Sequence, residues 1–190
     1  LVNKGLEIIE AHLLFGIPFE RITTVIHPQQ QIHSMVEFHD GSTIAQAGPP
    51  RMLVPIALGL SWPERLADVD DPCDWTAAQS WDFLPLDEVA FPSVPLAYAV
   101  GAAGGTMPAV YNAANEVCVD AFHDGLIRFT EIVDTIARVV DDHERGIASQ
   151  VCRAGTGIDA PTLDVESVLR ADEWARARAR AVLGLDEGIS

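Results

Sequence analysis

Lysine, cysteine and long hydrophobic runs are all scarce in this sequence. Lys4 is the only lysine among 12 basic residues, and 28 acidic residues give the 190-residue chain a formal net charge of −16. A surface of this sign repels the phosphate backbone, so we expect no nucleic-acid partner. The apolar runs fall short of the roughly 18 residues that a membrane span needs, so we expect no membrane partner either.

The cysteines Cys73, Cys118 and Cys152 stand far apart and form no Cys-x-x-Cys pair. Their spacing indicates neither a disulfide framework nor a zinc site. We expect buried, reduced thiols in a cytoplasmic protein, because no signal peptide is visible. The chain lacks an initiator methionine and opens directly on a motif at residues 1–5, which we interpret as a fragment of a longer protein.

A hydrophobic content of 48% is enough for a folded core and excludes a disordered chain. The length predicts one domain or two small ones. The acidic excess lies in residues 61–190, whereas residues 1–60 are nearly neutral and contain Lys4. A negative net charge therefore does not exclude an anionic ligand at the first segment.

Residues 1–60 carry the signals of helix and strand. Apolar residues at helical spacing (Leu6, Ile9 and Leu13) predict a first helix with a core-facing stripe, which stops at Gly16. Beyond it, β-branched or alternating stretches predict strands over 22–26, 32–38 and 43–47. We interpret these three strands as one antiparallel meander. A short apolar helix over 52–60 follows.

The rest of the chain separates into a connector and a helical part. Residues 61–92 are acidic and broken by prolines, and their interspersed aromatic residues are expected to pin them to a neighbouring surface. Within residues 93–190, one predicted helix begins with residues 95–100, and three more are predicted over 112–122, 130–140 and 173–183. A polar loop is predicted over 146–160. The predicted fold class is α+β: a helix and three-stranded meander joined by an acidic connector to a C-terminal helical bundle.

Polar side chains gather at the start of the first helix. Asn3 and Glu7 are four residues apart and Lys4 and Glu7 are three apart, so all three share neighbouring helix faces. A carboxylate can bind Mg²⁺ or Mn²⁺, and a lysine suits a phosphate. The spacing alone fits an ordinary capped turn with a Lys–Glu pair better than it fits a site.

Other polar residues allow two interpretations each. His27 and His33 flank a predicted turn and could meet a common ligand, or they are a turn residue and a satisfied strand histidine. No carboxylate or cysteine lies beside them at ligand spacing, so we expect no zinc site. Asn115 and Glu116 could be functional, but we predict that Glu116 is a buried or interfacial group that locks the bundle by hydrogen bonding. Arg176, Arg178 and Arg180 alternate and fan around a helix, so we predict a solvated surface rather than one basic patch.

Several motifs stand in one order along the chain: N-K-G-L-E at 3–7, H-P-Q at 27–29, I-H-S-M at 32–35, D-G-S at 40–42 and N-A-A-N-E at 112–116. In this order they resemble the 1-deoxy-D-xylulose 5-phosphate reductoisomerase family of the non-mevalonate isoprenoid pathway. The resemblance runs from residue 1 to about residue 184. It implies a homodimeric enzyme that converts this sugar phosphate to 2-C-methyl-D-erythritol 4-phosphate with NADPH and Mg²⁺ or Mn²⁺.

The same resemblance implies segments and site residues. Residues 1–60 would be the second half of a catalytic domain that holds metal and substrate, 61–92 the connector and 93–190 the C-terminal helical domain. Glu7 would be a metal ligand, with Lys4 and His33 as further catalytic residues. The residues that contact the substrate would be Asn3, Lys4, Pro50 and Met52.

The sequence also departs from the family pattern. Gln30 follows the H-P-Q motif where the family usually has serine. No glycine-rich dinucleotide fingerprint follows a predicted strand, so no residue here is assigned to NADPH. The family segment whose D-x-E motif supplies the other two metal ligands is also absent, so the chain alone is expected to be inactive. Two alternatives stay open: a non-catalytic dimerisation or binding module, and a paralogous sugar-phosphate reductoisomerase altered at Gln30.

Overall fold

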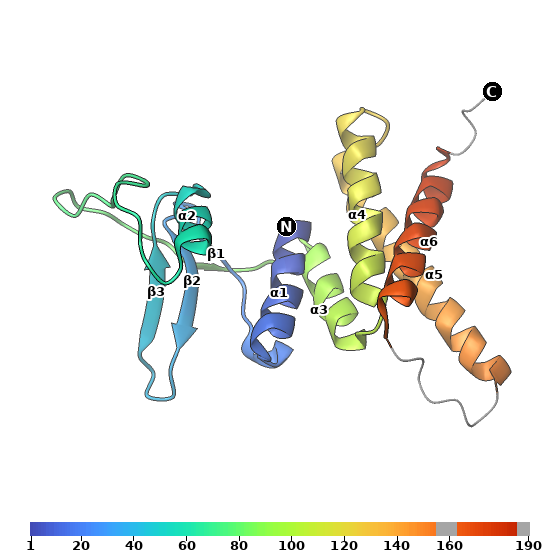
Figure 1. Ribbon diagram of the computed structural model, residues 1–190. Coiled ribbons are helices and arrows are strands. Elements are labelled where there is room, and N and C mark those ends of the chain that lie inside the picture. The colour runs from blue at the N-terminus through green and yellow to red at the C-terminus, as the bar shows by residue number, and fades with distance from the viewer. Residues whose placement is uncertain (155–162, 186–190) are drawn as a thin grey trace. The chain divides into compact units, whose positions relative to one another are not determined.

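The computed structural model describes residues 1–154 and 163–185, with side chains up to residue 147 in the first stretch. Helices and small sheets are mixed, as the α+β prediction requires (Figure 1). The chain divides into a helical unit, Leu1–Thr23 with Asp87–Ser190, and a sheet unit, Thr24–Leu86. The boundaries of these two units differ from those of the expected segments 1–60 and 61–92. The expected segments describe domains of the whole protein, so they remain a proposal.

The helical unit contains the first helix and the C-terminal helices. Its elements are α1 (Val2–Phe15), η1 (Phe19–Arg21), α3 (Ser93–Ala103), α4 (Met107–His123), α5 (Phe129–Ala154) and α6 (Val165–Leu183). In Figure 1, α4 lies beside α5 and α6, and α1 lies beside α3. Within the described residues, no helix is both long and apolar enough to cross a membrane.

The core of the helical unit is built from β-branched, aromatic and small residues. The largest side chains with almost no exposed surface come from α3, α4 and α5: Val94, Val100, Val110, Tyr111, Ile136 and Val139. Along α6 the buried positions are Ala171, Ala175 and Ala179, four residues apart. Small side chains on one helix face let α6 approach its neighbours closely.

The predicted first helix is confirmed, but its buried face differs in part. Gly16 ends α1 in the left-handed conformation, with φ of 64°, and donates its N–H to the His12 carbonyl. Ile9 is buried as expected, and Ile8 beside it is buried too. Leu13 is 69% exposed, so the predicted stripe does not continue into the last turn.

Three helix boundaries predicted in the C-terminal part were wrong. Helix α4 starts at Met107, five residues before the expected 112. Helix α5 runs on to Ala154, so the first half of the expected loop 146–160 is helical, whereas residues 155–160 lie outside the described residues. Helix α6 starts at Val165 rather than near 173, because Asp164 and Ser167 form a reciprocal capping box. Such a cap satisfies free N–H groups at the helix start and fixes the boundary there.

The sheet unit contains two small antiparallel sheets instead of one meander. Strands β2 (Ile32–Glu37) and β3 (Thr43–Ala47) form a hairpin, and β1 (Val25–Ile26) pairs with β4 (Leu84–Pro85). The three-stranded meander was therefore a wrong prediction. The turn after β1 contains Gln30 at φ of 53°, and the polar groups of this turn bond to the segment around β4 rather than to β2. Helix α2 (Leu53–Ser61) follows the hairpin, close to the predicted 52–60.

The described thiols follow the expectation in part. Cys118 is fully buried on α4, whereas Cys73 is half-buried in the sheet unit. The side chain of Cys152 lies outside the described residues. Burial raises the pKa of the Cys118 thiol to about 11, which keeps it protonated and unreactive near neutral pH.

Candidate functional site

The three polar residues at the start of α1 meet as the sequence predicts. Asn3 Nδ2 donates to Glu7 Oε1 at 3.0 Å, and Lys4 Nζ forms an ion pair with Glu7 Oε2. The Lys4 and Glu7 side chains are 44% and 46% exposed. An exposed carboxylate thus stands between an amide and an ammonium group, within reach of a ligand from solvent.

Gly5 lies on the opposite face of the same helical turn, and it is buried. A Cβ atom at Gly5 would lie 2.5 Å from Ala97 Cβ on α3 and 2.9 Å from the Tyr111 hydroxyl on α4. The N-K-G-L-E motif therefore has two faces. One presents the polar groups of Asn3, Lys4 and Glu7, and the other seats the helix on the bundle.

The described residues provide only part of a metal site. Among them, no group of three or more His, Cys, Asp and Glu side chains lies close enough to hold a metal ion. Glu7 fits as one ligand, because a carboxylate has about four lone-pair positions and Asn3 and Lys4 occupy two of them. Oxygen is also the donor that Mg²⁺ and Mn²⁺ prefer.

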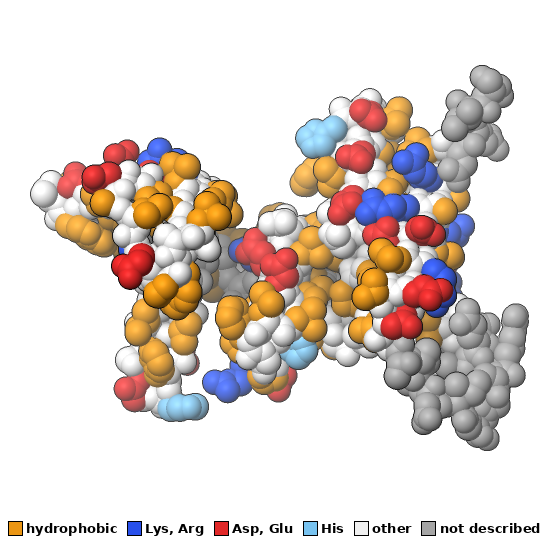
Figure 2. Space-filling model, viewed as in Figure 1, with side chains coloured by type: hydrophobic (Ala, Val, Ile, Leu, Met, Phe, Trp, Pro, Cys, Tyr) orange, Lys and Arg blue, Asp and Glu red, His pale blue; other side chains and the backbone are white. Residues whose placement is uncertain are grey.

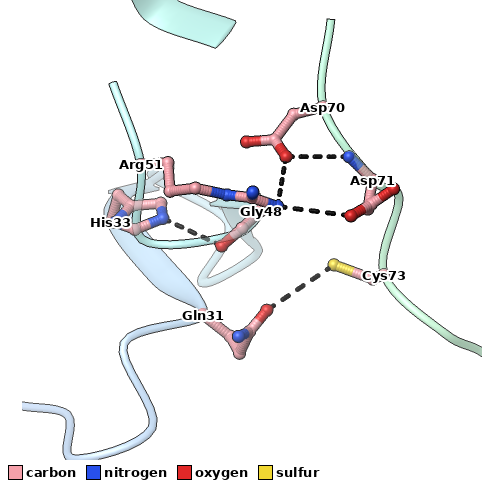
Figure 3. A network of polar contacts seen from close by, with 7 residues as sticks. All are labelled: Gln31, His33, Gly48, Arg51, Asp70, Asp71 and Cys73. Atoms are coloured by element: carbon pink, nitrogen blue, oxygen red, sulfur yellow. Dashed lines mark hydrogen bonds and ion pairs between the residues drawn. The ribbon is translucent and has the colours of Figure 1, made fainter. Parts of the chain in front are cut away.

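The other predicted site residues lie in the sheet unit. His33 on β2 donates from Nε2 to the Gly48 carbonyl at 3.0 Å, which fixes the ring beside the segment 48–52 (Figure 3). Pro50 and Met52 lie in that segment, and both are exposed. His33 is thus a hydrogen-bonded strand histidine, as one of its two interpretations expected.

Arg51 anchors the same segment on its other side. Its guanidinium pairs with Asp70 and, at 3.4 Å, with Asp71, as Figure 3 shows. The Asp70 side chain is only 3% exposed and the Arg51 side chain is 49% exposed, so the ion pair joins a buried carboxylate to a half-exposed guanidinium. Pro50 therefore lies between two tethers, His33 to Gly48 and Arg51 to Asp70. Arg51 was not predicted as part of this arrangement, because its partners are about twenty residues away in a stretch interpreted as connector.

The H-P-Q motif holds the strand pair β1–β4 together. His27 Nδ1 donates to the Asp82 carbonyl at 2.9 Å, and its ring stacks on Phe83 at 4.6 Å between centroids. Gln29 Nε2 donates to Asp82 Oδ2 at 2.6 Å, and Gln29 Oε1 accepts the Asp82 N–H at 3.2 Å. His27 and His33 thus bind separate partners, and no common ligand is needed to explain either. Turn chemistry was the correct interpretation of His27.

The N-A-A-N-E motif forms a clamp between α4 and α6. Asn112 Nδ2 donates to Glu116 Oε1 at 2.9 Å, and Arg176 Nη2 binds Glu116 Oε2 at 2.7 Å. Arg176 also pairs with Asp172, one turn away on α6, at 2.7 Å. Figure 2 shows acidic and basic side chains mixed over this part of the helical unit. Glu116 does lock the bundle, although it is exposed.

The prediction of solvated arginines was wrong for two of them. Arg176 joins α6 to α4 through Glu116, and Arg178 joins α6 to α5 through Asp142 at 2.7 Å. Neighbouring positions on a helix diverge by about 100°, so residues two apart reach different neighbouring helices. Helical spacing alone could not indicate which side each arginine faces.

Comparison with known families and structures finds consistent similarity. Residues 47–178 match the family model described as DXP reductoisomerase C-terminal domain. The 1-deoxy-D-xylulose 5-phosphate reductoisomerases of Kitasatospora griseola and Streptomyces avermitilis are 59% and 58% identical over 180 residues, which is 95% of this chain. A crystal structure of DOX-P reductoisomerase with NADPH, fosmidomycin and magnesium has 35% identity and a TM-score of 0.84 over 100% of this chain.

These matches cover only part of each relative. The chain spans 44% of the Kitasatospora griseola protein and 43% of the Streptomyces avermitilis protein. It covers 45% of the chain in the structure with NADPH, fosmidomycin and magnesium. A reductoisomerase from Zymomonas mobilis in complex with NADPH gives a TM-score of 0.79, with 38% identity and 45% coverage of that chain.

Proposed function

The chain belongs to the DXP reductoisomerase family, and we propose that it supplies the C-terminal part of an enzyme that rearranges and reduces a sugar phosphate. The substrate is 1-deoxy-D-xylulose 5-phosphate and the product 2-C-methyl-D-erythritol 4-phosphate. The observation that carries the proposal is the exposed group of Asn3, Lys4 and Glu7 on α1. Its three side chains converge while the opposite face of the helix is buried.

Glu7 is the proposed metal ligand, and Lys4 and Asn3 are the proposed substrate contacts. When Mg²⁺ or Mn²⁺ is bound, it polarises the carbonyl and hydroxyl oxygens of the substrate. Glu7 holds one position through a carboxylate oxygen. Lys4, a compact point charge, exchanges its pairing with Glu7 for substrate oxygens, and Asn3 orients an adjacent hydroxyl.

His33, Pro50 and Met52 are the proposed second group of site residues, on the sheet unit. The His33 ring is oriented by its bond to Gly48, so its remaining ring nitrogen can contact substrate. Pro50 and Met52 provide an apolar surface for the substrate carbon chain and the nicotinamide. Such a surface excludes water from the carbon that accepts hydride.

The other parts of the proposal concern the whole protein. We propose that NADPH binds mostly outside this chain, because none of the strands that the structure describes is followed by a glycine-rich dinucleotide fingerprint. We propose a cytoplasmic homodimer. The β2–β3 hairpin supports dimerisation, since the exposed residues Met35, Val36, Phe38 and Ile44 accompany strand edges that a partner can cover.

A chimera tests this function directly. The chain replaces the matching C-terminal part of the Kitasatospora griseola relative, and NADPH consumption is followed with 1-deoxy-D-xylulose 5-phosphate and Mg²⁺. We expect turnover by the chimera and a loss of at least about 100-fold in Glu7→Gln, because several kcal/mol of charge stabilisation depend on the bound metal. Glu10→Gln removes an exposed carboxylate from the same helix and should leave turnover unchanged.

The alternatives give different results. A folded chimera without turnover, beside an active unmodified relative, would favour a non-catalytic module. Turnover only with another sugar phosphate would favour a paralogous enzyme, and Gln30→Ser would then be expected to restore the family substrate. The Gln30 side chain is exposed and its backbone is in the left-handed conformation, so this substitution removes no buried contact.

A further inference from the structure

The first turn of α1 packs closely against α3 and α4 at Gly5. A Cβ atom added to Gly5 would lie 2.5 Å from Ala97 Cβ, 2.9 Å from the Tyr111 hydroxyl and 3.5 Å from the Ser93 carbonyl oxygen. Ordinary contacts of a Cβ atom fall at 3.4–4 Å. A methyl group at Gly5 therefore requires the first turn of α1 to move away from α3 by about 1 Å.

The groups facing Gly5 have little freedom to retreat. Ala97 belongs to the middle of α3 and has no exposed surface. Tyr111 is also fully buried, and its hydroxyl donates to the Ser93 carbonyl at 3.2 Å. Burial raises the pKa of Tyr111, so this hydroxyl stays a donor at all ordinary pH values. An added methyl group would therefore displace α1 rather than its neighbours.

Displacement of this turn moves the proposed site. Asn3 and Lys4 precede Gly5 directly, and Glu7 follows it within the same turn. An α-helix is stiff over one turn because each backbone N–H bonds four residues back. A shift of Gly5 therefore moves the Lys4 ammonium and the Glu7 carboxylate by a similar distance.

We propose that Gly5 is a positioning residue: its close packing against Ala97 and Tyr111 fixes where the helical bundle holds Lys4 and Glu7. The inference rests on the proposed function and deepens it. The C-terminal helices contribute to turnover by fixing the distance of α1 from α3, without touching the substrate. A misplacement of about 1 Å in a catalytic group can lower the rate about 100-fold.

The test uses the active chimera and the variant Gly5→Ala. We expect kcat to fall about 100-fold and the Mg²⁺ concentration for half-maximal turnover to rise, while the protein stays folded. The matched control is Gly101→Ala in the same helix pair. A Cβ there would lie 2.4 Å from Phe19 Cζ on η1 and 3.2 Å from Ile9 Cγ1 in the middle of α1, so its severe clash is with η1 rather than with the first turn of α1. It should lower the melting temperature but leave kcat within about threefold.

A rescue variant separates positioning from general destabilisation. Gly5→Ala combined with Ala97→Gly and Tyr111→Phe moves the methyl group from α3 to α1 and removes the hydroxyl beside it. We expect kcat to return to within about tenfold of the unmodified chimera, although glycine in α3 lowers helix stability. If Gly5→Ala alone does not fold, this variant still decides the question.

The outcomes distinguish the two proposals. Full kcat in a folded Gly5→Ala variant, an equal loss of kcat in Gly101→Ala, or no recovery in the rescue variant would each overturn the positioning role. In all three cases the active chimera would leave the proposed function standing. Failure of the unmodified chimera to turn over substrate would instead count against the proposed function, on which this role depends.

Discussion

The histidine of the H-P-Q motif should control how tightly β1 and β4 are held together. Its ring makes three contacts at once: Nδ1 donates to the Asp82 carbonyl, Nε2 accepts the Gln31 N–H at 3.1 Å, and the ring face stacks on Phe83. The carbonyl can only accept and the N–H can only donate. The ring is therefore neutral, with its proton on Nδ1. We predict that His27→Ala opens the β1–β4 pair.

The size of the effect follows from these contacts. Each neutral hydrogen bond contributes about 1 kcal/mol net, and an aromatic pair contributes about 0.5–1.5 kcal/mol. Because the site is partly exposed, we expect His27→Ala to lower the free energy of local opening by about 2 kcal/mol. His27→Phe keeps the stacked ring but loses both hydrogen bonds, so its loss should be smaller by about 1 kcal/mol.

Hydrogen exchange of the β1 backbone measures this local opening. A loss of about 2 kcal/mol corresponds to exchange that is about 30 times faster at Val25 and Ile26 in His27→Ala. His39→Ala is the matched control, since His39 is exposed in the hairpin turn of the same unit. Exchange within threefold of the unmodified chain in His27→Ala, or equal acceleration in His27→Phe, would refute the reasoning.

Three further predictions concern the helical unit. Cys118 should resist alkylation near neutral pH until the chain unfolds, because burial raises its pKa to about 11, and peptide mass spectrometry should find half-buried Cys73 modified first. Burial lowers the pKa of His143 below 6.5, so as the pH falls the unfolded chain binds a proton at this ring before the folded chain does. Stability should therefore fall as the pH drops below 6.5, and thermal melts of His143→Gln should show a smaller fall. Arg176→Met should cost about 0.5–1 kcal/mol, and a double-mutant cycle with Glu116→Gln should show less than additive losses, since both remove one contact.

Local signals predicted most of the helices. Gly16 marked the end of α1, and the short helix near 52–60 was found within one or two residues, because caps and apolar spacing act over a single turn. The face of α1 was harder to predict. Leu13 has the right spacing to be buried, yet it is 69% exposed, whereas Ile8 is buried beside Ile9.

Contacts between distant residues account for the errors. Val25 pairs with Pro85, about sixty positions later, so neighbouring β-rich stretches gave no indication of its true partner. Asp172 has the right chemistry for a helix cap, but Asp164 and Ser167 cap the helix two turns earlier and Asp172 pairs with Arg176 instead. A sequence pattern shows that a residue can cap or pair, whereas packing decides which candidate does.

The candidate site was predicted from helical spacing and from the family motif. Helical spacing is enough to bring Asn3, Lys4 and Glu7 together, and the family motif turned an ordinary helix start into a proposed site. The role of Gly5 was missed because it depends on Ala97 and Tyr111, about a hundred residues away. A glycine in the first turn of an otherwise good helix was the available signal, since glycine there costs stability unless close packing requires it.

Two groups in this chain share one arrangement, and their differences indicate which suits a ligand. In each, an asparagine donates to a glutamate four residues later and a basic side chain holds the other carboxylate oxygen. For Glu7 the basic partner is Lys4, on the same turn of α1, so a ligand that displaces it breaks no contact between helices. For Glu116 the partner is Arg176 on α6, and displacing it removes an ion pair that joins α6 to α4. The first group can therefore open to a ligand without the loss of a contact between helices, whereas opening the second costs such a contact.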